Sequence, residues 1–185
     1  MKKFELTTNT KIFLGKKLFQ IKALISFGDV EAGELGGYIE KEENLSQAGD
    51  AWVAGNARVT GDAWVTDNAW VKDNAWVTGN AWVKDNARVA GNARVTGNAR
   101  VTDNARVTDN ASYTTIKGFG REYRTTTFFR CKDGKVRVRC GCFYGDLEEF
   151  RAIVKKTHGE SKKAKEYLMI ADLMELHFEE NENDK

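Results

Sequence analysis

Ten valines spaced six residues apart dominate the pattern of apolar and polar positions. The series runs from Val53 to Val107, and an alanine stands two residues before each valine. Gly, Asn and Asp fill most of the positions before the alanines, and these residues adopt tight corners at low cost. A period of six fits neither an α-helix nor the alternation of an ordinary strand. The pattern predicts a solenoid in which each repeat supplies one short strand and one corner.

Three such repeats close a triangular coil of 18 residues, so that each side chain stacks on the one 18 positions later. Successive coils then lie about 4.8 Å apart, as neighbouring strands do. An aliphatic residue followed four positions later by a small one, as in Val59/Ala63 and Val65/Ala69, resembles the hexapeptide-repeat family. This resemblance implies a left-handed parallel β-helix. The expected fold is mainly β, with an N-terminal β cap and a small C-terminal α+β module.

The pattern divides the chain into four parts. Residues 1–27 alternate apolar and polar side chains and form the expected β cap, and residues 28–114 form the β-helix. Leu45 and Val53 are eight residues apart instead of six, which predicts an irregular first coil whose register slips by two. Residues 115–180 form the α+β module, with a strand turn at Asp133-Gly134 and helices that begin after Asp146 and at Ser161. Residues 181–185 are expected to be a disordered tail.

The residue before each valine is expected to face outward, which places tryptophan in the early coils and arginine in the later ones. Such a column either stacks on itself through cation–π contacts or offers a contact surface for a partner or a second copy. As in the hexapeptide family, a homotrimer is the expected oligomer. The candidate interface residues are Trp52, Trp64, Trp70, Trp76, Trp82, Arg88, Arg100 and Arg106.

Positive charge is concentrated after the repeats. The whole chain carries a net charge of +2, whereas residues 115–165 carry 14 basic and 6 acidic side chains, a net of +8. Lysine and arginine at this density predict binding of an anionic partner, such as RNA, DNA, a nucleotide or an acidic protein. The alternative is a solvated face neutralised by the acidic second helix and tail. The candidate binding residues are Arg121, Arg124, Arg130, Lys132, Lys135, Arg137 and Arg139.

Three cysteines, Cys131, Cys140 and Cys142, lie in the same segment. An odd number without a signal peptide favours a reducing cytoplasm, and no run of residues is apolar enough to span a membrane. With His158 these cysteines have three interpretations: core packing, a structural zinc site, or a nucleophile beside a base. Core packing is favoured, so that no cofactor is expected and no metal is assigned.

Catalysis on the repeats is not expected. Acyltransferases with a hexapeptide β-helix use a histidine as general base, and the only histidines, His158 and His177, lie outside the repeats. An acyltransferase therefore ranks as the last alternative.

Two further segments resemble hexapeptide-repeat proteins of bacteriophages and prophages. They are the stretch Gly36-Gly-Tyr-Ile-Glu-Lys-Glu42 and the stretch Cys140-Gly-Cys-Phe143. The resemblance implies a phage source and, with it, a non-enzymatic binding protein that inhibits a host defence pathway, such as an anti-CRISPR. The partner would be a host protein or ribonucleoprotein in the cytoplasm of the infected cell. The first alternative is a structural protein that assembles through its solenoid.

Overall fold

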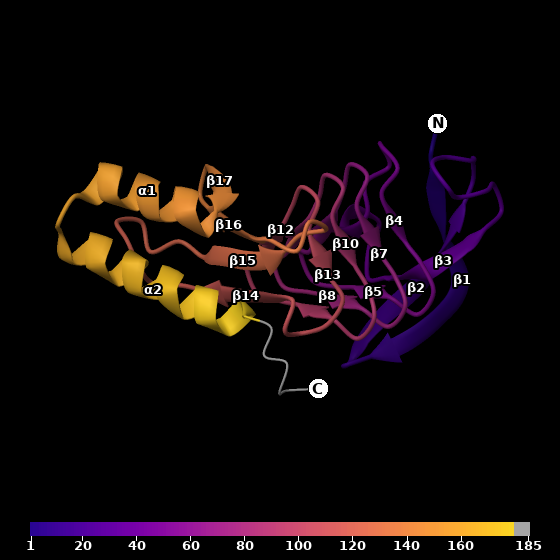
Figure 1. Ribbon diagram of the computed structural model, residues 1–185. Helices are drawn as coiled ribbons and strands as arrows, with labels where there is room; N and C mark the ends of the chain where they lie inside the picture. Colours follow the sequence, from indigo (N-terminus) through magenta and orange to yellow (C-terminus); the bar gives the residue numbers. More distant parts are fainter. Residues whose placement is uncertain (180–185) are drawn as a thin grey trace. The chain divides into compact units, whose positions relative to one another are not determined.

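The computed structural model describes residues 1–179, so the predicted tail at 181–185 lies outside the described residues. The chain divides into two compact units, Met1–Asn110 and a second that begins at Ala111. Figure 1 follows both units by colour along the sequence.

The first unit is a parallel β-solenoid, which confirms the predicted fold class. Strands 18 residues apart pair in register, so that Val71 lies between Val53 and Val89. All ten valines are fully buried and form the centre of the coils. The strands are β4 (Trp52–Val53), β7 (Trp70–Val71), β10 (Arg88–Val89) and β13 (Arg106–Val107) in one sheet; β5 (Arg58–Val59), β8 (Trp76–Val77) and β11 (Arg94–Val95) in the second; and β6 (Trp64–Val65), β9 (Trp82–Val83) and β12 (Arg100–Val101) in the third.

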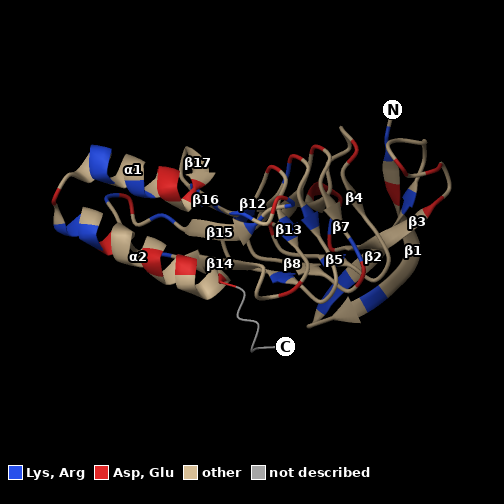
Figure 2. Cartoon of the chain, in the orientation of Figure 1, with Lys and Arg blue, Asp and Glu red and all other residues tan. Residues whose placement is uncertain are grey.

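The corners are formed by the residues that the repeat predicts. Gly61, Gly79 and Gly97 stack on one corner with positive φ, and Asp85 lies between Asp67 and Asp103 on another, also with positive φ. The carboxylates of Asp67 and Asp85 each accept a hydrogen bond from the backbone N–H of the next aspartate in the stack, at 3.3 and 3.2 Å. Acidic corners along the coils are red in Figure 2. Asparagine side chains 18 residues apart form amide ladders, as between Asn68 and Asn86 at 3.3 Å.

An N-terminal hairpin continues the second sheet. Strands β1 (Phe4–Phe13) and β2 (Lys16–Ala23) are antiparallel, and β2 pairs with β3 (Leu35–Ile39). β3 in turn pairs in parallel with β5, where Ile39 faces Val59. The paired residues Ile39 and Val59 are 20 positions apart in the sequence, as are Leu45 and Val65, which form an isolated bridge. The first coil therefore contains the predicted slip of two residues, which falls between Leu45 and Val53, after the short 3₁₀ helix η1 (Glu42–Asn44).

Trp52 corrects the expectation that every residue before a valine faces outward, because its side chain is completely buried. The N-terminal cap and the irregular first coil cover it: the ring of Phe27, in the cap, packs edge-on at 5.4 Å. Gly36 makes room for the indole, since a Cβ at that position would lie 2.7 Å from a carbon of the Trp52 ring. Trp52 is thus part of the core and no candidate for an interface.

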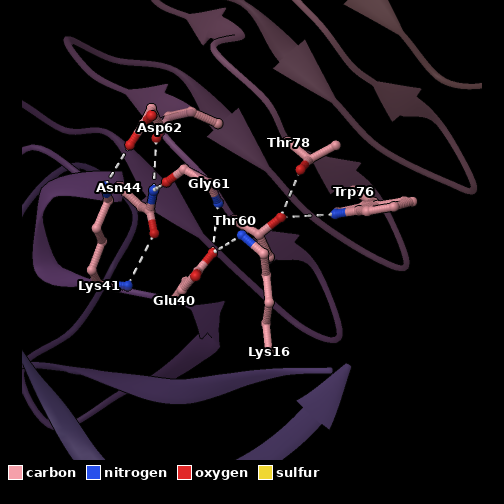
Figure 3. Close-up of polar contacts among 10 residues, drawn as sticks. Lys16, Glu40, Lys41, Asn44, Thr60, Gly61, Asp62, Trp76 and Thr78 are labelled. Atoms are coloured by element: carbon pink, nitrogen blue, oxygen red, sulfur yellow. Dashed lines mark hydrogen bonds and ion pairs between the residues drawn. The ribbon is translucent and has the colours of Figure 1, made fainter. Parts of the chain in front are cut away.

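Polar contacts fasten the hairpin and first coil to the regular coils (Figure 3). The Glu40 carboxylate accepts hydrogen bonds from Lys16 Nζ at 2.8 Å and from the Gly61 N–H at 2.6 Å. Trp76 Nε1 donates to Thr60 Oγ1 at 3.3 Å, and the ring of Phe13 packs edge-on against Trp76 at 5.2 Å. Trp76 is therefore half-covered by the hairpin.

The second unit is an antiparallel sheet packed against two helices, in agreement with the predicted α+β module. Val138 and Phe128 of the sheet pack into one apolar core with Phe150 of the first helix and Met174 of the second. The sheet order is β14 (Tyr113–Ile116), β15 (Thr126–Arg130), β16 (Val136–Cys140) and β17 (Phe143–Asp146), and the helices are α1 (Leu147–His158) and α2 (Lys162–Phe178).

The helix ends lie where the sequence places them. Asp146 and Glu149 form a capping box at the start of α1, Gly159 ends that helix, and Ser161 caps α2. These caps satisfy N–H groups that a helix cannot bond internally. Of the helices in residues 1–179, none is long and apolar enough to cross a membrane.

Candidate functional site

The C-terminal unit contains a pocket of about 290 Å³. It lies among the loop at residues 117–125, the turn between β16 and β17, and the two helices. Its lining combines apolar side chains with several titratable groups, which is the composition of many small-molecule and side-chain binding sites. The lining residues are Phe119, Arg121, Glu122, Arg124, Cys140, Cys142, Phe143, Phe150, Ile153, Val154, Thr157, His158 and Tyr167.

Packed aromatic rings form the apolar wall. Phe150 of α1 lies at their centre, with the ring of Phe143 at 5.6 Å and the ring of Tyr167 edge-on at 5.6 Å. Phe128 of the sheet contacts the other side of Phe150 at 6.2 Å, also edge-on. Edge-on contacts are favourable ring arrangements, so the rings of the wall stabilise one another in these positions.

Tyr167 connects the pocket to the loop above it. Its hydroxyl donates to the Phe119 carbonyl at 3.2 Å and lies 4.0 Å from the Cys140 sulfur. Burial raises the pKa of Tyr167 to about 12, and Cys140 contributes to the rise while Arg124 opposes it. The phenol is therefore neutral at physiological pH and presents a hydrogen-bonding group instead of a charge. Gly120 permits this contact, because a Cβ there would overlap the Tyr167 hydroxyl.

Two guanidinium groups border the pocket. Arg124 is exposed and lies over Gly141, where a Cβ would come within 2.7 Å of Arg124 Nη1. Within residues 1–179, Arg124 forms neither an ion pair nor a hydrogen bond. Arg121 has a loose contact of 3.6 Å with Glu122, and both side chains are largely in solvent, where such a pair contributes little. Both arginines are thus available to an anion.

The structure does not gather the other predicted basic residues at this pocket. Arg130 donates to the Phe178 carbonyl at 2.8 Å and lies over the Phe178 ring, which ties β15 to the end of α2. Arg137 forms an ion pair with Asp133 at 2.8 Å. Lys132 and Lys135 are exposed near the Asp133-Gly134 turn. Arg137 and Arg139 alternate with valines along β16: Val138 is buried in the helix-facing core, so the arginines belong to the other face of the sheet.

The cysteines and the histidine fall into two groups. Cys140, Cys142 and His158 line the pocket, whereas Cys131 is buried elsewhere in the unit. Within the described part of the chain, no three His, Cys, Asp or Glu side chains come together as a metal site would require. Cys131 therefore does not join Cys140, Cys142 and His158 in this structure, and their arrangement gives the zinc interpretation no support. His158 instead stacks on Tyr167, with ring centroids 6.0 Å apart and planes 23° apart.

The outward columns of the solenoid differ in exposure. Trp64 and Trp82 each expose 37% of their surface, while Trp70 and Trp76 are half-buried. The rings of Trp64 and Trp82 meet edge-on at 5.5 Å, and the guanidinium of Arg100 lies 4.9 Å from the centre of the Trp82 ring. Arg88 is exposed and Arg106 half-buried. The predicted cation–π stacking is therefore present in the column where Trp82 is followed by Arg100.

Comparison with known proteins finds no protein family whose sequence profile matches this chain and no curated protein that matches it. The phage resemblance stays a prediction.

Sequence reasoning identified Arg121, Arg124, Cys140, Cys142 and His158 but did not predict that they share a pocket. It missed the aromatic wall, although Phe143, Phe150 and Tyr167 were visible as apolar positions. The sequence pattern did not indicate β17 as a separate strand. This strand pairs with β16 from Arg137 to Cys140 and brings Phe143 beside Phe150.

Proposed function

We propose that this chain is a non-enzymatic phage protein that inhibits a host defence pathway, and that it captures an anionic partner at the pocket of the C-terminal unit. The supporting observation is the combination at that pocket of an uncommitted guanidinium, Arg124, with an aromatic wall. A guanidinium binds phosphate or carboxylate through two parallel N–H donors. The rings beside it accept a base, an aromatic side chain or another flat apolar group.

The ligand class follows from this pairing. A bare inorganic anion would leave the wall unused, and a purely apolar ligand would leave Arg121 and Arg124 unused. The pocket suits a group that carries a negative charge next to a flat ring, as a nucleotide within RNA does. A host ribonucleoprotein of a CRISPR-type defence system, in the cytoplasm of the infected cell, offers such groups.

The test is capture from a bacterial host lysate by tagged protein, followed by mass spectrometry and extraction of nucleic acid. The reversed-charge variant Arg121→Glu/Arg124→Glu is compared with Lys132→Glu/Lys135→Glu, which changes the net charge equally at the exposed turn. We expect the first variant to lose the partner and the second to keep it. If only Lys132→Glu/Lys135→Glu lost the partner, the binding site would lie at the exposed turn instead of at the pocket.

A second candidate function is assembly through the solenoid. The exposed rings of Trp64 and Trp82 favour it, since an exposed aromatic pair is a common centre for protein association. Light scattering decides between the two: a trimer that Trp64→Ser/Trp82→Ser converts to a 20.8 kDa monomer favours assembly. A wild-type monomer favours the binding protein.

A further inference from the structure

The solenoid has a second concave surface beside Trp64, and its charge is opposite to that of the C-terminal pocket. This groove has a volume of about 810 Å³ and is lined by Trp64, Trp82 and the segment around η1. Three carboxylates, those of Glu42, Glu43 and Asp62, border it against a single lysine, Lys41. The lining is therefore aromatic and net negative.

The groove exists because one column of outward side chains stops at Trp64. The column runs from Arg100 to Trp82 to Trp64, and the register of the first coil places Asn44 next. Asn44 does not continue the column. Its side-chain amide turns into the coil and donates to the Gly61 carbonyl at 3.0 Å and the Ala63 carbonyl at 2.8 Å (Figure 3). Asn44 is consequently fully buried, and the space above the Trp64 ring is left open.

The same column shows what fits such a space. One coil further along, the Arg100 guanidinium lies over the Trp82 ring at 4.9 Å. A cation above an indole ring is attracted by the negative charge of the ring face. An arginine from another molecule, placed over Trp64, would repeat the Arg100–Trp82 contact at the open end of the column.

A carboxylate is available for that arginine. Lys41 already bonds to Asp62 at 2.7 Å, and Lys2 bonds to Glu42 at 2.9 Å. Glu43 is exposed and forms neither a hydrogen bond nor an ion pair within residues 1–179. A guanidinium over Trp64 could therefore pair with Glu43.

We propose that this groove binds an arginine side chain of a basic peptide segment in a partner protein, with Trp64 as the stacking surface and Glu43 as the counter-ion. The site is independent of the anionic ligand at the C-terminal unit. Together the two sites would let one chain hold both components of a ribonucleoprotein.

The test is titration of the full chain with a fluorescent peptide, Gly-Ser-Arg-Gly-Arg-Gly-Ser, and with the same peptide carrying neutral citrulline in place of both arginines. We expect the arginine peptide to bind and the citrulline peptide to bind at least 10-fold more weakly, a difference of about 1.4 kcal/mol. Trp64→Ser and Glu43→Gln should each weaken the arginine peptide by roughly 3- to 30-fold. Trp64→Phe should recover part of the loss, because it restores a ring.

Glu5→Gln is the matched control, since Glu5 is an exposed carboxylate on β1 that does not line the groove. It should bind as the wild type does. Circular dichroism melting confirms that each variant is folded. Equal binding of the two peptides overturns the proposal, as does wild-type affinity of folded Trp64→Ser or Glu43→Gln. The proposal is also overturned if the wild type forms an oligomer that Trp64→Ser dissociates and binds no peptide. The groove would then be the contact with a second copy of this chain.

Discussion

The hydroxyl of Tyr167 on α2 donates a hydrogen bond of 3.2 Å to the carbonyl of Phe119, in the loop that covers the candidate pocket. The two residues are 48 positions apart, and the bond is one of the links that hold this loop over the aromatic wall. Because Arg121 and Arg124 belong to the same loop, the position of both cations depends on it.

Tyr167→Phe should therefore destabilise the protein by about 0.5–1.5 kcal/mol, the usual net value of one such bond, and weaken partner binding. Urea denaturation measures the first effect and titration of the captured partner the second. Tyr123→Phe is the control, because Tyr123 lies in the same loop with an exposed side chain. Unchanged stability and affinity in Tyr167→Phe would show that the loop is held in place without this bond.

The same tyrosine predicts a pH dependence at the alkaline end. The folded pKa of Tyr167 is raised to about 12 from the ordinary value of 10. A raised pKa means that the folded state favours the neutral phenol, so its contribution to stability is complete below pH 10 and is lost as the pH rises through 12. The stability difference between wild type and Tyr167→Phe should thus shrink over this range. A difference that grows with pH would contradict the assignment.

Two glycines on one corner of the solenoid should differ in their tolerance of a side chain. Gly79 and Gly97 both have positive φ, so alanine at either costs about 1–2 kcal/mol in backbone strain. At Gly79 the new Cβ would also lie 2.9 Å from the Gly97 oxygen, whereas at Gly97 no atom lies within 4 Å. Gly79→Ala should be the more destabilising by about 1 kcal/mol or more. Equal melting temperatures would mean that the coils shift apart easily.

Arg130 is expected to stabilise the second unit and to take no part in partner binding. Its bond to the Phe178 carbonyl and its position over the Phe178 ring hold the end of α2, so Arg130→Ala should cost about 1–2 kcal/mol. Partner capture by the folded variant should be unchanged. If Arg130→Ala were as stable as the wild type but no longer captured the partner, Arg130 would belong to the binding surface.

The regular parts of the fold were predictable because the information is local and repeated. Each valine, such as Val71, has the same neighbours six residues away, so one repeat predicts the next. The starts of both helices followed from Asp146 and Ser161, which act within one turn of the chain.

The exceptions depend on residues far apart in the sequence. Trp52 has the same local sequence as Trp64 but is buried, because Phe27 of the N-terminal cap and Gly36 of the irregular first coil enclose it. The groove above Trp64 likewise depends on the inward rotation of Asn44. The pocket arises where a loop without any periodicity meets Tyr167, and no short-range pattern records that contact.

The central claim is that Arg121 and Arg124 bind the partner whose capture inhibits the host defence. The most direct measurement is the plating efficiency of a defence-sensitive phage on the host from which the partner was captured, with the protein expressed in that host. Wild type and Lys132→Glu/Lys135→Glu should restore plating, and Arg121→Glu/Arg124→Glu, expressed and folded at the same level, should not. Full restoration by the reversed-arginine variant, or no restoration by the wild type, would contradict the account.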